Sequence, residues 1–222
     1  MPLPTSHLTG SGGLPHAARL YAADTATGRG ALLVLAHGAG AGQSHPFMVR
    51  YAQGLAERGL DIVTFDFPYM EAGRRAPDRA PVLEEAFRRV VAAAGARPQL
   101  NARRLFIGGK SMGGRMATHV AAAPDLWPEH APPLAGVVVF GYPLNPPGGA
   151  SKRSPDRVSH LARIAVPVLI VQGTRDTFGG PDAIRAAMPH AIVHDVAGGD
   201  HSPAARYDQA VLDGVAAFVS AT

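Results

Sequence analysis

Cysteine is missing from all 222 residues of the chain. Its absence excludes disulfides, cysteine-ligated metal sites and a thiol nucleophile. Since a reducing compartment favours such a composition, we expect a cytoplasmic location. Charge is also sparse, because Asp, Glu, Lys and Arg make up only 17% of the residues, while 46% are hydrophobic. This balance is typical of a globular chain and excludes a disordered one.

Long apolar stretches and concentrated basic runs are missing too. No stretch approaches the roughly 18 apolar residues of a membrane span, and residues 1–13 lack the apolar run of a secretory signal. The net charge is +4, and arginines occur in scattered pairs rather than in a stripe interleaved with aromatics. We therefore expect a small-molecule partner, and neither a membrane nor a nucleic acid. The sequence leaves open whether the chain forms a homodimer.

Apolar runs alternate with helical patterns from residue 31 to the end of the chain. Short β-branched runs bounded by Gly and Pro are predicted as strands: 31–36, 61–67, 104–108, 136–140, 166–171 and 191–196. Helical patterns fall between and after them: 47–55, 81–95, 112–123, 181–188 and 203–218. The alternation predicts an α/β fold with a mostly parallel sheet and helices on both faces. We expect residues 1–222 to form a single domain.

Three local features refine this prediction. Residues 14–23 are expected to add an edge strand, and residues 1–13, rich in Pro, Gly, Ser and Thr, to be flexible. Ser202 is predicted to cap the last helix, with Pro203 at its first position.

The central motif is Gly109-Lys110-Ser111-Met112-Gly113, a G-x-S-x-G pattern between a predicted strand and a predicted helix. In such a nucleophile elbow, a strained turn raises the serine hydroxyl above the sheet, and the glycines let strand and helix approach closely. The motif predicts an α/β-hydrolase fold with Ser111 as nucleophile. The alternative is a glycine-rich turn without chemistry.

Gly109-Lys110-Ser111 also matches the end of a phosphate-binding loop. That motif requires a glycine five residues before Gly109, where this chain has Arg104 inside a predicted strand. The phosphate-binding interpretation is therefore excluded.

An acid and a histidine are expected to activate the serine, in that chain order. Asp176 follows the strand predicted at 166–171, at the sheet edge where open α/β sheets bind ligands. His201 lies in a glycine-rich loop after the last strand and is the predicted base. The alternatives are a turn-forming role for Asp176 and an ordinary loop position for His201. Other histidines are interpreted as structural or surface residues: His45, His119, His160 and His194.

Small residues follow the first predicted strand in the run His37-Gly-Ala-Gly-Ala-Gly42. Such a loop allows a backbone N–H group to turn into the site and bind an oxyanion. We predict the N–H of Met112 as one donor, and that of Ala39 or Gly40 as the other. The alternative is that the glycines only allow a tight turn at the end of the strand, with no role in oxyanion binding.

Three segments of the sequence resemble a small α/β-hydrolase group related to dienelactone hydrolases. They are the run that begins His37-Gly-Ala-Gly, the segment Gly109-Lys-Ser-Met-Gly-Gly-Arg115 and the segment Gln172-Gly-Thr-Arg-Asp176. The resemblance covers about residues 31–220 and implies Ser111, Asp176 and His201 as the catalytic triad. Dienelactone hydrolases carry a cysteine nucleophile, whereas this chain has a serine. The resemblance leaves the substrate undefined.

The predicted function is that of a carboxylesterase-like serine hydrolase. It would cleave a small ester, thioester or lactone through an acyl-serine intermediate, with no cofactor and no metal. This fold often carries a lid in the segment that corresponds to residues 144–165. Here the segment is short and lacks a hydrophobic helix, so we expect a minimal cap or none. Two alternatives stay open: a non-catalytic scaffold or binding module on the same fold, and a serine peptidase.

Basic residues near the expected site have two interpretations. They either favour a carboxylate-bearing substrate or are solvated surface residues: Arg74, Arg75, Arg79, Arg115 and Lys152. Lys110, beside the nucleophile, either raises the local positive potential or pairs with a carboxylate below the elbow.

Overall fold

A single sheet organises the computed structural model, which describes residues 18–23, 28–98, 100, 103–147, 149 and 155–222. Its seven strands run in the order β1-β3-β2-β4-β5-β6-β7. Their bounds are Arg19–Tyr21 (β1), Ala31–Ala36 (β2), Leu60–Phe65 (β3), Arg104–Lys110 (β4), Leu134–Phe140 (β5), Val168–Gly173 (β6) and Ile192–Val196 (β7). Only β1 pairs antiparallel, with β3, and all the other pairs are parallel. The predicted mostly parallel α/β sheet is confirmed.

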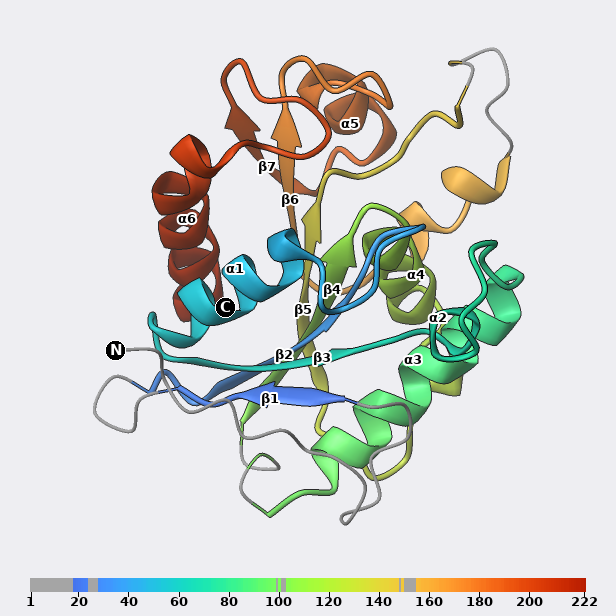
Figure 1. The fold of residues 1–222 in the computed structure, drawn as a ribbon, viewed down its shortest axis with the longest axis vertical. Coiled ribbons are helices and arrows are strands. Elements are labelled where there is room, and N and C mark those ends of the chain that lie inside the picture. Colours follow the sequence, from blue (N-terminus) through green and yellow to red (C-terminus); the bar gives the residue numbers. More distant parts are fainter. Residues whose placement is uncertain (1–17, 24–27, 99, 101–102, 148, 150–154) are drawn as a thin grey trace.

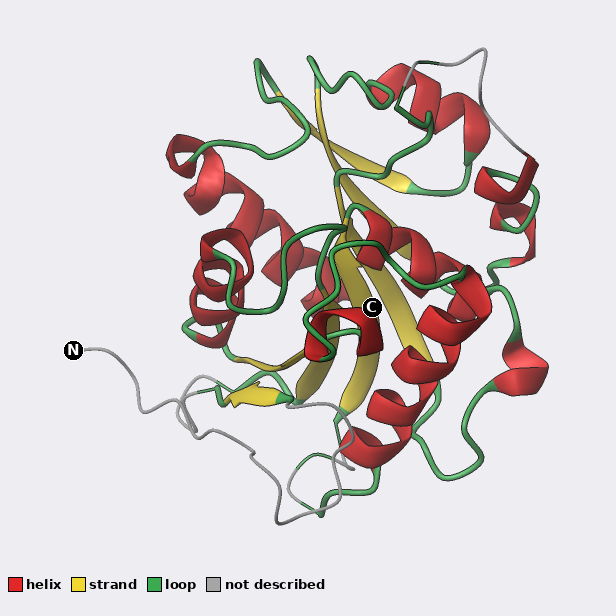
Figure 2. Cartoon of the chain, turned by 45° about the vertical axis from the view of Figure 1, so that its right-hand side comes forward, coloured by secondary structure: helices red, strands yellow, loops and turns green. Residues whose placement is uncertain are grey.

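Helices cover both faces of this sheet (Figure 1). On one face, α1 (Pro46–Ala56) packs beside α6 (Asp208–Ala221), and on the other, α3 (Ala80–Gly95) packs beside α4 (Met112–Ala121). The short α2 (Pro68–Glu71) follows β3, and α5 (Pro181–Ala187) lies against β7. Figure 2 shows the twisted sheet between the helical layers.

Strand β2 illustrates why its sequence is apolar throughout. Leu32 and Val34 belong to the core cluster under α3 and α4, whereas Leu33 and Leu35 belong to the cluster under α1 and α6. Because alternate side chains of a strand point to opposite faces, a strand covered on both faces is apolar at every position.

The connection between β5 and β6 carries no α-helix in its described part. It holds two short 3-10 turns, η3 (Pro155–Arg157) and η4 (Leu161–Arg163). The expected minimal cap agrees with this arrangement. Further 3-10 turns are η1 (Pro124–Leu126) and η5 (Ala205–Tyr207). No helix among the described residues is both long and apolar enough to cross a membrane.

The predicted start of the last helix is wrong. Helix α6 begins at Asp208, after η5, and Ser202 does not cap it. The backbone N–H of Ser202 instead donates to Asp200 Oδ1 at 3.0 Å. This bond forms a turn that contains His201, and the chain must leave the sheet edge before it can pack α6 along the face.

Strand ends also differ from the prediction by a few residues. Strand β3 ends at Phe65 rather than at Phe67, because Phe67 is already the N-cap residue of α2. Strand β4 continues to Lys110, beyond its predicted end at residue 108. The expected edge strand is present as β1, while the flexible start expected at residues 1–13 lies outside the described residues.

The order of the strands positions the site. The chain places β3 on one side of β2 and then β4 on the other side. At such a switch point, the loops leaving the carboxyl ends of the two strands diverge and leave a crevice. The loop after β2 and the turn after β4 therefore meet at one edge of the sheet.

Candidate active site

Ser111 occupies the sharp turn between β4 and α4. Its backbone has φ 51° and ψ −113°, and it is the one non-glycine residue with positive φ in the described part of the chain. Such a conformation costs about 1–3 kcal/mol and persists only where the surrounding structure enforces it. The backbone thus has the strained geometry that the G-x-S-x-G motif predicts.

Two glycines make this turn sterically possible. A Cβ on Gly109 would lie 2.4 Å from the carbonyl carbon of Gly113, and a Cβ on Gly113 would lie 2.4 Å from the carbonyl oxygen of Ala36. Real Cβ atoms do not approach backbone atoms so closely. Glycine is therefore required at both positions for the strand and the helix to make this contact.

We expect Gly109→Ala to lower the free energy of unfolding by about 2 kcal/mol or more, because the atoms that the new methyl meets are backbone. Urea denaturation measures this change. Gly180→Ala is the matched control, since the Cβ there would lie 3.8 Å from its nearest neighbour, Thr174 O. Equal stability of Gly109→Ala and the wild type would contradict the steric argument.

The structure brings Ser111, His201 and Asp176 together. His201 Nε2 lies 2.8 Å from Ser111 Oγ, and His201 Nδ1 lies 2.8 Å from Asp176 Oδ2. The Asp176 side chain is fully buried, whereas that of His201 is 20% exposed. The three residues lie beyond the carboxyl ends of β4, β6 and β7, so distant segments of the chain meet at one edge of the sheet.

Asp176 is held by donors from its own strand and loop. Gln172 Nε2 donates to Asp176 Oδ2 at 2.8 Å, and the backbone N–H of Phe178 donates to Oδ1 at 2.8 Å. A buried carboxylate requires such partners. The Phe178 ring also packs on the His201 ring, with the centroids 4.5 Å apart.

Sequence reasoning assigned no role to Gln172 or Phe178. A signal for Gln172 was available in the sequence, because this polar residue directly follows the apolar run 166–171 and stands four residues before Asp176. Phe178 had no comparable signal, since its position in the loop gives no indication of which ring it covers.

The predicted oxyanion donors lie close to Ser111. Met112 is the first residue of α4, so its backbone N–H has no acceptor within the helix. Ala39 lines the same cavity as Ser111, whereas Gly40 is not among the described residues that line it. Of the two alternatives, this placement favours Ala39.

His37 fixes the loop that carries Ala39. Its Nε2 accepts from the backbone N–H of Phe67 at 3.0 Å, and its Nδ1 lies 2.8 Å from the carbonyl oxygen of Gly38. Burial lowers the pKa of His37, which favours the neutral ring that both bonds require. The sequence analysis named His37 only as part of the loop.

Lys110 connects the elbow to the loop of His201. Its side chain is buried, and its Nζ donates to the backbone carbonyl oxygen of His201. Nζ also lies 5.6 Å from the centroid of the Phe47 ring. Burial lowers the pKa of Lys110 to about 8, against the opposing effect of the Asp176 and Asp200 charges. Neither sequence interpretation foresaw this bond to a carbonyl group.

A cavity of about 550 Å³ opens at the Ser111 hydroxyl. Apolar side chains form much of its wall: Phe47, Met48, Leu83, Met112 and Phe178. Among the basic residues considered from the sequence, Arg115 lines the cavity, while Arg74, Arg75 and Arg79 are exposed and do not. Lys152 lies outside the described residues.

Of the other histidines considered from the sequence, His45 lines the cavity at Ser111, whereas His119, His160 and His194 do not. His45 caps α1 by accepting from the N–H of Phe47 at 3.2 Å. The His119 and His160 rings pack together with centroids 3.8 Å apart, and burial lowers the pKa of His160 to about 3. His194 lies within β7. In the described part of the chain, no three acidic or histidine side chains form a cluster that could hold a metal ion.

A mostly parallel sheet, a strained serine elbow and acid and histidine loops at one sheet edge together define an α/β-hydrolase fold. A family model described as an alpha/beta hydrolase domain matches residues 29–213, and the chain therefore belongs to this family. No match was found among curated proteins.

Several solved structures share the fold. Dienelactone hydrolase from Anabaena variabilis is 20% identical over 91% of this chain and 88% of that chain, with a TM-score of 0.68. TT1662 from Thermus thermophilus is 22% identical over 100% of both chains, with a TM-score of 0.68. XC6422 from Xanthomonas campestris, described as a serine hydrolase without a lid, is 17% identical over 99% and 93%, with a TM-score of 0.67.

Proposed function

We propose that this chain is a carboxylesterase-like serine hydrolase that cleaves a small ester, thioester or lactone through an acyl-serine intermediate. The observation that carries the proposal is the unbroken line of contacts from Ser111 Oγ through His201 to the buried Asp176 carboxylate, at 2.8 Å each. An isolated serine hydroxyl is a poor nucleophile at neutral pH, and this arrangement supplies the base that it needs.

In the first half of the reaction, Ser111 Oγ attacks the substrate carbonyl carbon while His201 Nε2 accepts the hydroxyl proton. Asp176 accepts from His201 Nδ1–H and stabilises the imidazolium that forms. The N–H groups of Met112 and Ala39 donate to the carbonyl oxygen as it becomes an oxyanion. His201 then gives its proton to the leaving alkoxide or thiolate, and the acyl group stays on Ser111.

In the second half, water replaces the alcohol. His201 removes a proton from this water, which attacks the acyl carbon, and the proton returns to Ser111 Oγ as the acid leaves. The cavity volume of about 550 Å³ falls in the range of small-molecule sites. The short connection between β5 and β6 supports a small substrate rather than a long lipid chain.

A fluorophosphonate probe tests the nucleophile directly, because it phosphonylates activated serines. Mass spectrometry should locate the label on Ser111, and a panel of p-nitrophenyl esters should be hydrolysed. Aminoacyl amides form the comparison set, since their preferential cleavage would indicate a peptidase. An unlabelled protein with no ester hydrolysis would leave a scaffold or binding module as the function.

We expect Lys110→Met to lower kcat about tenfold with little change in KM, because the His201 loop loses a bond that places the base. Ester hydrolysis at pH 7 measures this effect. An unchanged kcat would contradict a positioning role for Lys110.

The pH dependence of stability provides a second readout of the same variant. Between about pH 8 and 10.5, the unfolded chain retains the Lys110 proton that the folded chain has released. Over this interval, the wild-type free energy of unfolding should therefore rise with pH relative to that of Lys110→Met. Denaturation at pH 7.5 and pH 10 measures the difference, and parallel curves would contradict the lowered pKa.

A further inference from the structure

Cationic side chains outnumber carboxylates around the cavity at Ser111. Among the described lining residues, Lys110, Arg115 and Arg157 are cationic, and Asp78 carries a carboxylate. Arg74 already holds this carboxylate through bonds of 2.7 and 3.0 Å. Lys110 is engaged with the His201 carbonyl group. The two arginines therefore dominate the charge that a ligand would meet.

Arg115 lies one helical turn after the nucleophile, within the first turns of α4. Its side chain is only 15% exposed, and its Nη1 lies 3.2 Å from Asp156 Oδ2, whose side chain is 58% exposed. Its buried Nε has no hydrogen-bond acceptor in the described part of the chain. Because Nε is buried, only the remaining N–H groups of the Arg115 guanidinium can meet a ligand in the cavity that Arg115 lines.

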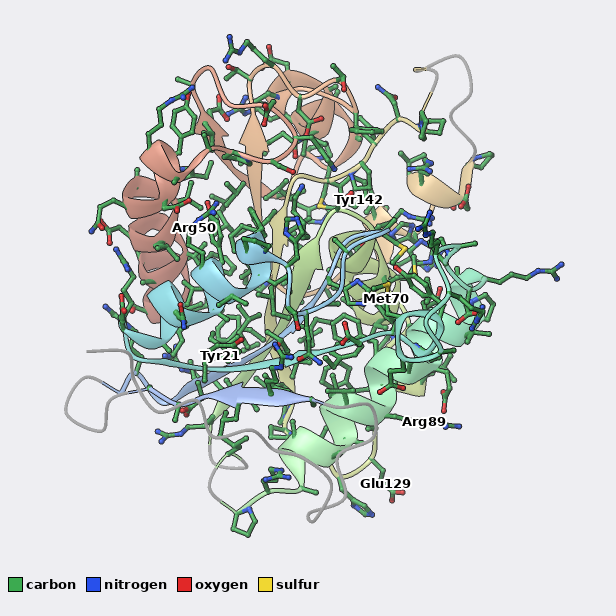
Figure 3. All side chains as sticks on the ribbon, viewed as in Figure 1. Tyr21, Arg50, Met70, Arg89, Glu129 and Tyr142 are labelled. Atoms are coloured by element: carbon green, nitrogen blue, oxygen red, sulfur yellow. The ribbon has the colours of Figure 1, made fainter. Side chains whose placement is uncertain are left out.

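Arg157 approaches the same cavity from η3. Its Nη1 donates to the backbone oxygen of Pro143 at 2.7 Å, and its own backbone oxygen accepts from Tyr142 Oη at 2.7 Å. Figure 3 shows Tyr142 beyond the end of β5, close to α4. The guanidinium is thus fixed by its neighbours before any ligand binds, which reduces the entropic cost of recognition.

Arg115 and Arg157 repel each other. Burial, and then the nearby Arg115 charge, lower the pKa of Arg157. Both groups nevertheless stay protonated, because an arginine does not lose its proton in proteins. Asp156 offsets part of this repulsion, because its carboxylate pairs with Arg115 and opposes the lowering of the Arg157 pKa. An anion bound between the two arginines would offset more of it.

We propose that the substrate carries a carboxylate, which Arg115 and Arg157 bind in the cavity that holds Ser111. This inference rests on the proposed hydrolase function and specifies its substrate as an acidic ester. Since Arg115 is one helical turn from the nucleophile, the carboxylate belongs a few bonds from the scissile carbonyl. Guanidinium groups suit this recognition because their N–H donors match the two oxygens of a carboxylate.

Three esters of similar size test the proposal. Monoethyl succinate places a carboxylate on the acyl side, carboxymethyl butyrate places one on the alcohol side, and ethyl butyrate is neutral. The wild type should hydrolyse at least one of the acidic esters with a kcat/KM about tenfold or more above that of ethyl butyrate. Rates for both acidic esters at or below the neutral rate would overturn the proposal.

The variants Arg115→Gln and Arg157→Gln should each remove the preference. We expect about 10- to 100-fold loss of kcat/KM for the preferred acidic ester and a change within about twofold for ethyl butyrate. Arg89→Gln is the matched control, because Arg89 is an exposed arginine that pairs with Glu85 on α3 (Figure 3) and does not line the cavity. Equal losses on acidic and neutral esters would overturn the assignment.

Binding of succinate and butyrate separates this inference from the proposed function. Titration calorimetry should show succinate binding to the wild type more tightly than butyrate, and both arginine variants should lose that difference. If no ester is hydrolysed and the fluorophosphonate does not label Ser111, the hydrolase function fails while succinate binding still decides the anion site. If ethyl butyrate is hydrolysed but succinate binds no better than butyrate, the anion site alone is wrong.

Discussion

Replacing Ser111 with alanine is expected to lower ester turnover by about 10⁴-fold or more, because no acyl-enzyme can form without the hydroxyl. The residual rate would come from the oxyanion donors and from substrate binding. Steady-state hydrolysis of a p-nitrophenyl ester measures the loss. The fold should stay intact, since the substitution removes one oxygen from a side chain that is not part of the core.

Ser202→Ala is the control for this experiment. Ser202 lines the same cavity and directly follows His201, but its position lies outside the line of contacts between Ser111 and Asp176. We expect near-normal turnover for this variant. Full activity of Ser111→Ala, with the melting temperatures of both variants unchanged, would refute the nucleophile assignment.

Asp176→Asn is expected to lower kcat by about 10³–10⁴-fold with little change in KM. The asparagine amide has nearly the shape of the carboxylate, but it is neutral and can present a donor to His201 Nδ1. The imidazole then adopts the tautomer with its proton on Nε2, which cannot accept the proton of Ser111. The variant also loses the negative charge that stabilises the imidazolium.

Asp182→Asn provides the comparison for Asp176. The Asp182 side chain is fully exposed in the first turn of α5 and pairs with Arg185, so its replacement should leave kcat unchanged. Fluorophosphonate labelling rates give an independent measurement, because they report the reactivity of Ser111 without requiring deacylation. Rapid labelling of Asp176→Asn would show that the carboxylate does not support the base.

The histidine pair formed by His119 on α4 and His160 before η4 shows why residue type alone does not indicate a catalytic role. The buried His160 hydrogen-bonds with Thr118 Oγ1 at 2.9 Å, and His119 Nδ1 lies 3.1 Å from Glu84 Oε1. Both histidines pack between helices and have their partners there. His201 differs because its partners are a serine on a strained turn and a buried carboxylate.

Local sequence patterns predicted most of the fold. Continuous apolar strands such as β2 follow from a sheet covered on both faces, since side chains on either side of the strand are buried. The elbow was predictable because Gly109 and Gly113 are the residues that the strand-to-helix contact permits. The start of α6 was not predictable, because the Ser202-Pro203 capping pattern was outweighed by the turn from Asp200 to Ser202 that contains His201.

The sequence by itself determined the parallel α/β sheet, the strained serine turn and the order of nucleophile, acid and histidine, because each depends on contacts between residues close in the chain or on strand periodicity. Only the tertiary structure decided which side chains support them. The bond from Lys110 to the His201 carbonyl group spans 91 residues, and Arg115 shares its cavity with Arg157 on a separate connection. Such pairs depend on how whole loops pack at the sheet edge, and no local pattern encodes that packing.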